Sequence, residues 1–239
     1  MYNHKNQTKA FLLESERYVG NYLNDEARID IFFNKNIKSR EVNSILDVGC
    51  GNGEFLNEWK NYYKINNAVG VEPSRKSVLK IREKWKKDKN MKFETAFAHK
   101  LPFDNDSFDI VVINSVLHWI GRNEYLQSLG ELIRVCKKYL YVMDFVALCD
   151  YRVNYSHREN LFTYKQDFEV PINLSGIMET IEKKMWYVDS VSKRICKINE
   201  EDLKPFKNNF ISYHARKGVL FKKNYNLLPL CNENEFLTK

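Results

Sequence analysis

Residues 45–55 read ILDVGCGNGEF, and this stretch decides the fold class. A short apolar run ends in Asp47, and three glycines follow at alternate positions: Gly49, Gly51 and Gly53. A run of this length bounded by glycines is typical of a buried strand. Glycines let a ligand approach the backbone, and the next helix exposes unpaired N–H groups at its start. The stretch therefore predicts a ligand-binding turn at the carboxyl end of a sheet strand.

Strands and helices alternate on both sides of this turn. This rhythm indicates βαβ units, so we expect an α/β protein with a mostly parallel sheet and helices on both faces. The expected strands are residues 43–49, 67–72, 91–97, 107–115 and 139–145, and the expected helices are residues 54–63, 74–88 and 122–139.

Composition narrows the class of protein. The chain has 239 residues and a net charge of +7, which fits one domain with a lysine-rich surface. The longest apolar run, residues 108–120, is too short to span a bilayer, and the N-terminus lacks a secretory signal pattern. The five cysteines are scattered and form no metal-binding or disulfide pattern. We expect a cytoplasmic protein that binds no membrane, no nucleic acid and no metal.

A second motif follows the glycines. Glu72 ends the second expected strand about 20 residues on, where a carboxylate can accept both hydroxyls of a ribose. The glycine spacing is D-x-G-x-G-x-G rather than the dinucleotide pattern G-x-G-x-x-G, and Glu54 would repel a pyrophosphate. A ligand that carries a positive centre fits these acids better.

Four stretches together resemble the class I S-adenosylmethionine-dependent methyltransferases of the small-molecule type: ILDVGCGNGEF, VGVEPS, LPFDNDSFDIVV and LIRVCKKYLYVMDF. The resemblance implies a Rossmann-like three-layer αβα sandwich with a seven-stranded sheet and an antiparallel last strand. It also implies S-adenosylmethionine as cofactor and S-adenosylhomocysteine as product. The implied cofactor-binding residues are Asp47, Gly49, Cys50, Gly51, Gly53, Glu72, Pro73 and Asn114.

The chain departs from the family pattern before LPF. The family has an acid that bonds the adenine amino group, and Phe97 stands in that position here. Our hypothesis is that Phe97 stacks on the adenine while the N–H of Ala98 and the side chain of His99 reach its edge.

His118 is the candidate general base. It follows the fourth expected strand by a few residues, at the edge where ligands bind, and histidine titrates near neutral pH. The competing interpretation is a structural histidine packed beside Trp119.

The acceptor site is expected in residues 149–168, which follow the fifth strand and are rich in tyrosine and basic residues. Such side chains favour an anionic acceptor, for example a phosphorylated, phosphoramidate or sugar-linked metabolite, methylated on oxygen. The competing interpretation is an ordinary basic surface loop. Fold-level analogy adds surface-polysaccharide biosynthesis as a setting. The candidate substrate-binding residues are Arg17, Tyr18, Trp119, Tyr151, Arg152, Tyr155, His157, Arg158 and Tyr164.

We expect one methyltransferase domain over the whole chain. Its parts are an N-terminal helical cap (1–40, helical over 11–36), a cofactor-binding core (41–145), a substrate lid (146–184), C-terminal strands (185–223) and a tail (224–239). Within these parts we expect a helix over 177–184, strands over 185–198 and 216–223, and a helix that begins near residue 199.

Three other functions remain open at this point. A nicotinamide-dependent oxidoreductase is disfavoured by the glycine spacing, and a non-catalytic binding module is disfavoured by the intact Gly49, Gly51, Gly53 and Glu72. An RNA methyltransferase is motivated by the charge of +7, but the fourth strand ends in NSVLH without the N-P-P-[FY] signature.

Overall fold

The computed structural model describes residues 33–155, 161–189, 191–192, 194–203 and 214–228. The helix expected over residues 11–36 lies outside the described residues except for its last four positions, which form coil and turn. Residues of the polar tail after 228 also lie outside them.

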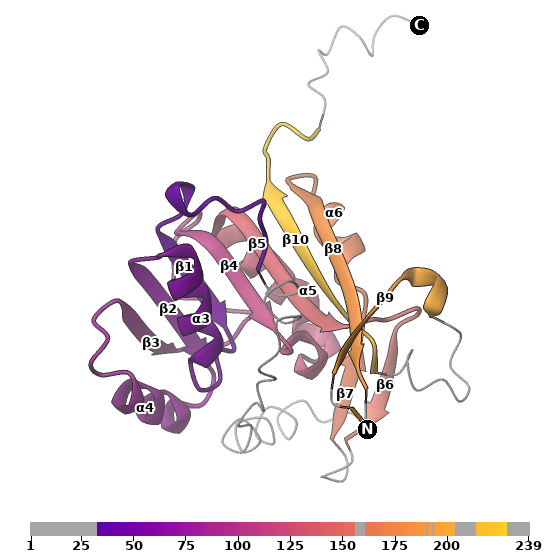
Figure 1. Ribbon diagram of the computed structural model, residues 1–239, viewed down its shortest axis with the longest axis horizontal. Coiled ribbons are helices and arrows are strands. Elements are labelled where there is room, and N and C mark those ends of the chain that lie inside the picture. Colours follow the sequence, from indigo (N-terminus) through magenta and orange to yellow (C-terminus); the bar gives the residue numbers. More distant parts are fainter. Residues whose placement is uncertain (1–32, 156–160, 190, 193, 204–213, 229–239) are drawn as a thin grey trace, which may run out of the picture.

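An eight-stranded sheet forms the centre of the molecule, in the order β3-β2-β1-β4-β5-β10-β8-β9 (Figure 1). The first five strands are mutually parallel, and β10 runs antiparallel between β5 and β8. This confirms the fold class and the antiparallel last strand, but the sheet has eight strands rather than seven, because the single strand expected over residues 185–198 is divided between the end of β8 and β9. The strands are β1 (Ser44–Val48), β2 (Asn67–Glu72), β3 (Met91–Thr95), β4 (Phe108–Asn114), β5 (Cys136–Phe145), β8 (Met178–Val188), β9 (Ile195–Ile198) and β10 (Arg216–Lys223).

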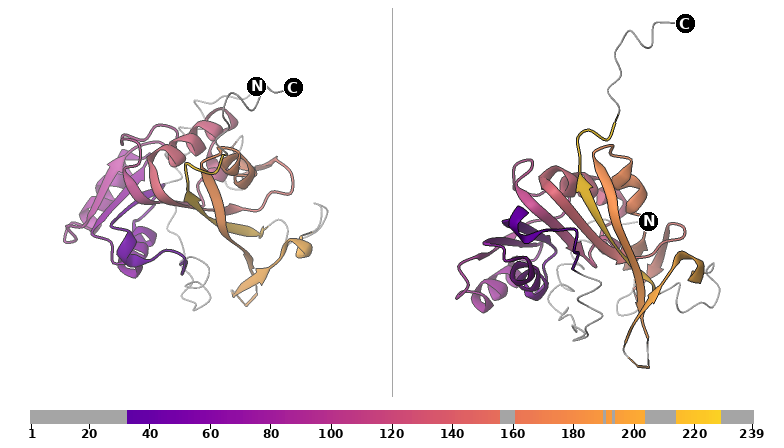
Figure 2. Two further views of the ribbon diagram at one scale, coloured as in Figure 1. Left: turned by 90° about the horizontal axis from the view of Figure 1, so that it is seen from above. Right: turned by 45° about the horizontal axis from the view of Figure 1, so that its top comes forward.

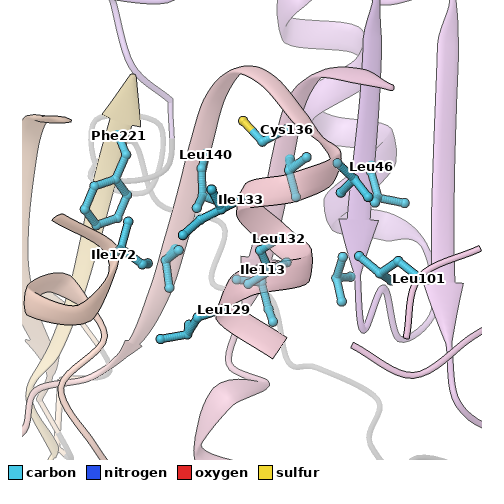
Figure 3. Close-up of a cluster of buried hydrophobic side chains, with 14 of the residues drawn as sticks. Leu46, Leu101, Ile113, Leu129, Leu132, Ile133, Cys136, Leu140, Ile172 and Phe221 are labelled. Atoms are coloured by element: carbon cyan, nitrogen blue, oxygen red, sulfur yellow. The ribbon is translucent and has the colours of Figure 1, made fainter. Parts of the chain in front are cut away.

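Helices cover both faces of the sheet (Figure 2). One face packs against α3 and α4 through a core that includes Trp59 and Ile81, and the other packs against α5 and α6 through a core that includes Leu132 and Ile172 (Figure 3). The strands that lie between the two cores are apolar on both sides, as buried parallel strands must be. The helices are α3 (Glu54–Tyr63), α4 (Arg75–Lys84), α5 (Arg122–Val135) and α6 (Glu169–Asn173), with the short 3-10 turns η1 (Ser39–Glu41), η2 (Leu117–Trp119) and η3 (Glu200–Asp202).

The expected helix over residues 177–184 is wrong, because these residues begin β8. Met178 packs into one core and Ile181 against the other, so the two side chains lie on opposite faces of the sheet. Phe221 pairs with Thr180 and Leu220 with Glu182, which leaves Ile181 as the extra residue of a β-bulge. Residues three apart lie on opposite faces of a strand but on one face of a helix, so the spacing of Met178 and Ile181 resembles a helix in the sequence.

The expected helix over residues 122–139 is too long. It ends at Val135, and β5 begins at Cys136 without an intervening loop. Cys136 is fully buried and its N–H still donates to Leu132 O, so one residue ends the helix and starts the strand. Neither glycine nor proline marks this boundary in the sequence.

A small antiparallel hairpin of β6 (Tyr151–Asn154) and β7 (Phe162–Lys165) lies beyond the carboxyl end of β5, apart from the main sheet (Figure 1). It occupies the first part of the region expected as a lid. The last part of that region, from Met178 onward, belongs to the sheet instead.

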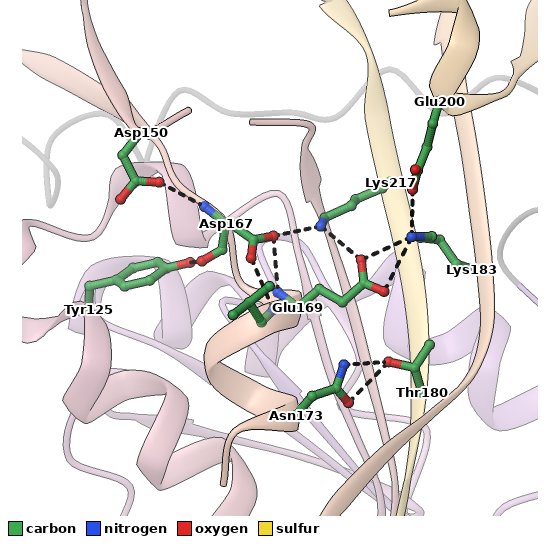
Figure 4. A network of polar contacts seen from close by, with 10 residues as sticks. Tyr125, Asp150, Asp167, Glu169, Asn173, Thr180, Lys183, Glu200 and Lys217 are labelled. Atoms are coloured by element: carbon green, nitrogen blue, oxygen red, sulfur yellow. Dashed lines mark hydrogen bonds and ion pairs between the residues drawn. The ribbon is translucent and has the colours of Figure 1, made fainter. Parts of the chain in front are cut away.

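A buried network of charges fastens α6 to the sheet beside this hairpin (Figure 4). Lys217 on β10 is 7% exposed, and its Nζ lies 2.7 Å from Asp167 Oδ1 and 3.0 Å from Glu169 Oε2. Asp167 caps α6 by accepting from the N–H groups of Glu169 and Val170. Lys183 on β8 also contacts Glu169, so the two strands are tied to one helix start.

Candidate functional site

The turn between β1 and α3 holds the three glycines in left-handed conformation, with φ of 76° at Gly49, 54° at Gly51 and 80° at Gly53. A Cβ at Gly49 would meet Val116 Cγ2 at 2.4 Å, and one at Gly53 would meet Trp85 Nε1 at 2.7 Å. A Cβ at Gly51 would meet nothing within 4 Å. The outer two glycines are therefore required by packing of the protein, and Gly51 alone opens onto free space.

The turn leans on the end of β2. The N–H groups of Gly49 and Cys50 both donate to Val71 O, at 2.8 and 3.0 Å. The next N–H, from Gly51, donates to Glu72 Oε2 at 3.3 Å. Glu72 is 5% exposed, so the carboxylate lies inside the turn rather than on the surface. The structure thus joins two motifs that the sequence separates by about 20 residues.

Asp47 stands under the turn as a buried acid. It is 1% exposed, and no described residue makes a hydrogen bond with its Oδ2. Burial, and secondarily the charge of Glu72, raises the pKa of Asp47 to about 8. Burial and the same two acids also raise the pKa of the Cys50 thiol. Asp47 and Glu72 thus place two carboxyl groups at the turn, and Asp47 Oδ2 has no hydrogen bond with any described residue. Such a site suits a ligand that brings a positive charge and hydrogen-bond donors.

The residues expected near the adenine lie just beyond Glu72. Ala96 donates its N–H to Glu72 O at 3.3 Å, which brings the end of β3 against the end of β2. Phe97 is 36% exposed, and its ring centroid lies 5.4 Å from that of His99. The structure brings Phe97 and His99 together beside Glu72, and the partly buried Ala98 lies between them in the chain. Pro73 directly follows Glu72 and is partly buried.

The end of β4 turns sharply toward the glycines. Asn114 ends the strand, and Ser115 adopts φ of 57°, a conformation that non-glycine residues rarely take. Ser115 Oγ donates to Asn114 Oδ1 at 3.0 Å. The turn then delivers Val116 against Gly49 and begins η2, which carries His118.

His118 is buried and held by an acid. Its Nδ1 lies 2.8 Å from Asp144 Oδ1, and its backbone N–H donates to Asp144 Oδ2 at 3.1 Å. Burial would raise the pKa of Asp144, but the charge and hydrogen bonds of His118 outweigh it, and the pKa is lowered. A carboxylate at Nδ1 favours the tautomer whose Nε2 carries the lone pair, and no described residue bonds Nε2. His118 also packs beside Trp119, at 5.1 Å between ring centroids, as the structural interpretation expects.

Two cations flank the aromatic residue that ends β5. The Nζ of Lys165 lies 4.0 Å from the ring centroid of Phe145, and Arg216 Cζ lies 4.4 Å from it. Lys165 is 4% exposed, and burial and the charge of Arg216 lower its pKa to about 8 against the opposing charge of Asp144. Arg216 also donates to Ser115 Oγ at 2.9 Å. The edge next to His118 is therefore positively charged.

Of the expected acceptor residues, Tyr151, Arg152 and Tyr164 line one cavity on the hairpin. Tyr155 meets Trp119 edge to face, with ring centroids 4.9 Å apart. The other four expected acceptor residues, Arg17, Tyr18, His157 and Arg158, lie outside the described residues.

Sequence reasoning missed Asp144 and Arg216, and it placed Lys165 in the acceptor stretch without a role of its own. The available signal for Asp144 was an acid inside the apolar run YLYVMDF, at the ligand edge of a buried strand. Nothing in the sequence alone pairs Arg216, on the last strand, with a loop a hundred positions earlier.

Comparison with known proteins agrees with this geometry. A family model described as a methyltransferase domain matches residues 45–139, from the start of β1 into β5. Residues 45–139 form a class I S-adenosylmethionine-dependent methyltransferase domain. For this family S-adenosylmethionine is the implied methyl donor.

Curated relatives of the methyltransferase domain match only part of their length. An uncharacterized methyltransferase of Schizosaccharomyces pombe is 31% identical over 63% of this chain and 57% of its own length. A malonyl-[acyl-carrier protein] O-methyltransferase of Legionella pneumophila is 33% identical over 38% of this chain and 30% of its own length. The chain thus spans little more than half of the first relative and under a third of the second.

Solved structures share the fold of the methyltransferase domain and of the strands that follow it. A chain of the complex between the Haloferax volcanii Trm112 methyltransferase activator and a methyltransferase is 13% identical, with a TM-score of 0.61. The alignment covers 93% of this chain and 98% of that one.

Two kinds of feature are absent from the described residues. None of their helices combines the length and apolarity needed to cross a bilayer. No group of three or more His, Cys, Asp and Glu side chains among them is placed to hold a metal ion.

Proposed function

We propose that this chain transfers a methyl group from S-adenosylmethionine to an oxygen of a small anionic acceptor. One observation carries the proposal. His118, held by the buried Asp144, follows Val116 by two residues, and Val116 packs directly against Gly49 of the glycine turn. A candidate base and a candidate cofactor turn therefore lie at one edge of the sheet.

The residues of the turn fit the cofactor. Glu72 would accept hydrogen bonds from the ribose hydroxyls, and Gly51 leaves the space that a ligand needs. Asp47 suits the ammonium group of the amino acid part, which Gly49 and Cys50 would line. Phe97 would stack on the adenine beside Pro73, Ala98 and His99, and Asn114 would lie near the sulfur.

When bound, S-adenosylmethionine supplies a methyl group on a positively charged sulfur, which an acceptor oxygen can take. The protein positions the acceptor and excludes water. A hydroxyl acceptor must lose its proton as the new bond forms, and Nε2 of His118 accepts it. Asp144 holds the ring in place and stabilises the charge that the ring gains.

The charge of the acceptor is inferred from Lys165 and Arg216, which make the edge beside His118 positive. A phosphorylated, phosphoramidate or sugar-linked metabolite fits such an edge. Methylation on oxygen is the chemistry named for the Legionella pneumophila relative. Trp119 and the hairpin residues Tyr151, Arg152, Tyr155 and Tyr164 would contact the acceptor, and Arg17, Tyr18, His157 and Arg158 remain candidates for the same role.

The division of the chain is part of the proposal. The core of residues 41–145 would hold the cofactor, and the hairpin at the start of region 146–184 would cover the acceptor. Residues 185–223 would complete the sheet, between an N-terminal cap (1–40) and a tail (224–239).

Calorimetric titration with S-adenosylhomocysteine tests the proposal. We expect micromolar binding that Glu72→Ala weakens about tenfold or more, since the variant loses charge-assisted hydrogen bonds. Glu94→Ala, on the neighbouring strand β3, is the matched control and should bind like the wild type. Absence of binding to folded, ligand-free wild type would overturn the cofactor assignment.

A further inference from the structure

A cavity of about 400 Å³ lies on the hairpin of β6 and β7. A volume of this order suits a small organic group. The described residues that line it come from three places: the first residue of α5, the two hairpin strands, and the residue that follows β7. These residues are Arg122, Tyr151, Arg152, Tyr164 and Gln166.

Gln166 gives the cavity an unmet hydrogen-bonding need. The residue is 9% exposed, and no described residue makes a hydrogen bond with its buried Nε2. Leaving a buried amide donor without an acceptor costs about 1–3 kcal/mol. Gln166 lines the cavity, and a small rotation of its amide would bring Nε2 to the cavity surface, where an oxygen of a bound molecule would satisfy this donor.

Two arginines make the same cavity positive. Arg152 is exposed, and its guanidinium lies over the ring of Phe162 at 4.7 Å. Arg122 is 67% exposed, and its Nη2 lies 3.6 Å from Asp150 Oδ2, so the contact leaves most of its donors available. Guanidinium groups bind carboxylate and phosphate oxygens with paired hydrogen bonds.

The hairpin that carries the cavity also contacts the edge that carries His118. Tyr155, at the end of β6, meets Trp119 with ring centroids 4.9 Å apart. Lys165, beside Gln166 in the chain, reaches Phe145, whose ring meets that of His118 at 4.9 Å. The hairpin therefore connects the cavity with the edge that carries His118.

We propose that this cavity is an oxyanion subsite, which binds a phosphate or carboxylate group of the acceptor through Gln166, Arg122 and Arg152. The inference deepens the proposed function and rests on it for the identity of the acceptor. Binding of the oxyanion itself does not depend on the cofactor. The subsite would fix the distance between the anionic group and the oxygen that is methylated.

Inorganic phosphate and acetate are the probes, each titrated into ¹⁵N-labelled full-length protein. The side-chain amide signals of Gln166 report on the cavity directly, and their loss in Gln166→Leu assigns them. We expect saturable shifts of these signals with at least one probe. The tighter of the two identifies phosphate or carboxylate as the recognised group.

Variants separate the subsite from general attraction to a basic protein. Arg152→Ala and Gln166→Glu should weaken binding of the probe by about tenfold, because each removes a donor and the second adds repulsion. Arg40→Ala, in η1 at the opposite edge of the sheet, should leave it unchanged. The subsite would be overturned if all three variants bound the probe as tightly as the wild type, or if binding to the wild type did not saturate.

A parallel titration with S-adenosylhomocysteine distinguishes the two proposals. Arg152→Ala and Gln166→Glu should keep the wild-type affinity for this ligand, which shows that both variants are folded. If wild type binds the probe but not S-adenosylhomocysteine, the cofactor assignment fails and the oxyanion subsite stands. If it binds S-adenosylhomocysteine but neither probe, the subsite fails and the cofactor assignment stands.

Discussion

Asp144 accepts two hydrogen bonds from His118, one from its backbone N–H at 3.1 Å and one with ring Nδ1 at 2.8 Å. One carboxylate thus fixes both the position and the rotation of the ring. Asp144 is 3% exposed, so water does not compete for these bonds. The arrangement is stiff enough for a base that must meet an acceptor oxygen at hydrogen-bond distance.

Removal of this base should slow catalysis without loss of the cofactor. We expect His118→Ala to lower kcat about 100-fold or more, the usual contribution of a general base. Asp144→Asn should lower it less, since Nε2 survives but its tautomer and orientation are no longer fixed. The measurement is S-adenosylhomocysteine release with an acceptor found by screening phosphorylated metabolites. Full activity of His118→Ala at every pH would leave His118 a structural residue.

Cofactor binding should release a proton from Asp47. Its pKa of about 8 means that the carboxyl is largely protonated in the empty site at pH 7. The ammonium group of the ligand favours the ionised form, so affinity should rise as pH increases toward 8. Titration of S-adenosylhomocysteine in two buffers of different ionisation enthalpy counts the protons released.

Asp47→Asn is the control for this release. The variant should release no proton on binding, and its affinity should vary less with pH. The free energy of unfolding of the empty wild type should also fall as pH rises from about 4 to 8. In this range the folded state holds a proton on Asp47 that the unfolded chain has lost. The variant lacks this slope. Identical proton counts in both proteins would exclude Asp47 as the source.

Alanine substitutions at Gly51 and Gly53 should differ in their effects on stability and on cofactor binding. Gly51→Ala places its Cβ in open space, so it should cost about 1–2 kcal/mol for the left-handed backbone alone, and weaken cofactor binding by occupying the site. Gly53→Ala also forces its Cβ against Trp85 Nε1 and should destabilise the fold more. Urea unfolding measures the loss of stability in each variant, and S-adenosylhomocysteine titration measures the loss of binding. The reverse order in stability would contradict the packing seen at Gly53.

The buried lysine of β10 should be a structural requirement. Lys217→Met leaves Asp167 and Glu169 facing each other without the cation between them, and should destabilise the protein by about 3 kcal/mol at pH 7. Burial would raise the pKa of Asp167, but Lys217 outweighs it, so the effect should shrink as pH falls below about 4. Lys222→Met, exposed on the same strand, is the urea-unfolding control. Equal free energies of unfolding for Lys217→Met and Lys222→Met would show that the charge network around Lys217 does not stabilise the fold.

The strands β1, β2 and β4 were predictable because each is an apolar run closed by polar or glycine residues, and β3 because its apolar and polar residues alternate. The glycine turn beside Glu72 was predictable because glycines and Glu72 follow the ends of two such apolar runs. The first half of β8 was not, because its apolar residues Met178 and Ile181 are three apart, a spacing typical of one face of a helix.

Only part of the edge that carries His118 was predictable from the sequence. His118 follows a strand end, so its position could be inferred from the chain. Its partner Asp144 belongs to another strand, and Arg216 reaches Ser115 only because β10 inserts antiparallel beside β5. Long-range pairing of this kind depends on strand order, which local patterns do not encode.

The short β9 strand covers only Met185–Val188 of the long β8 strand, so no described strand pairs with the outer side of its first half. An open strand edge is a template on which other chains can aggregate. Here the bulge interrupts the ladder, and charged residues populate the edge: Glu179, Glu182, Lys183 and Lys184. Addition of a foreign strand would have to desolvate these charges, so the protein should resist amyloid-like growth from this side of the molecule.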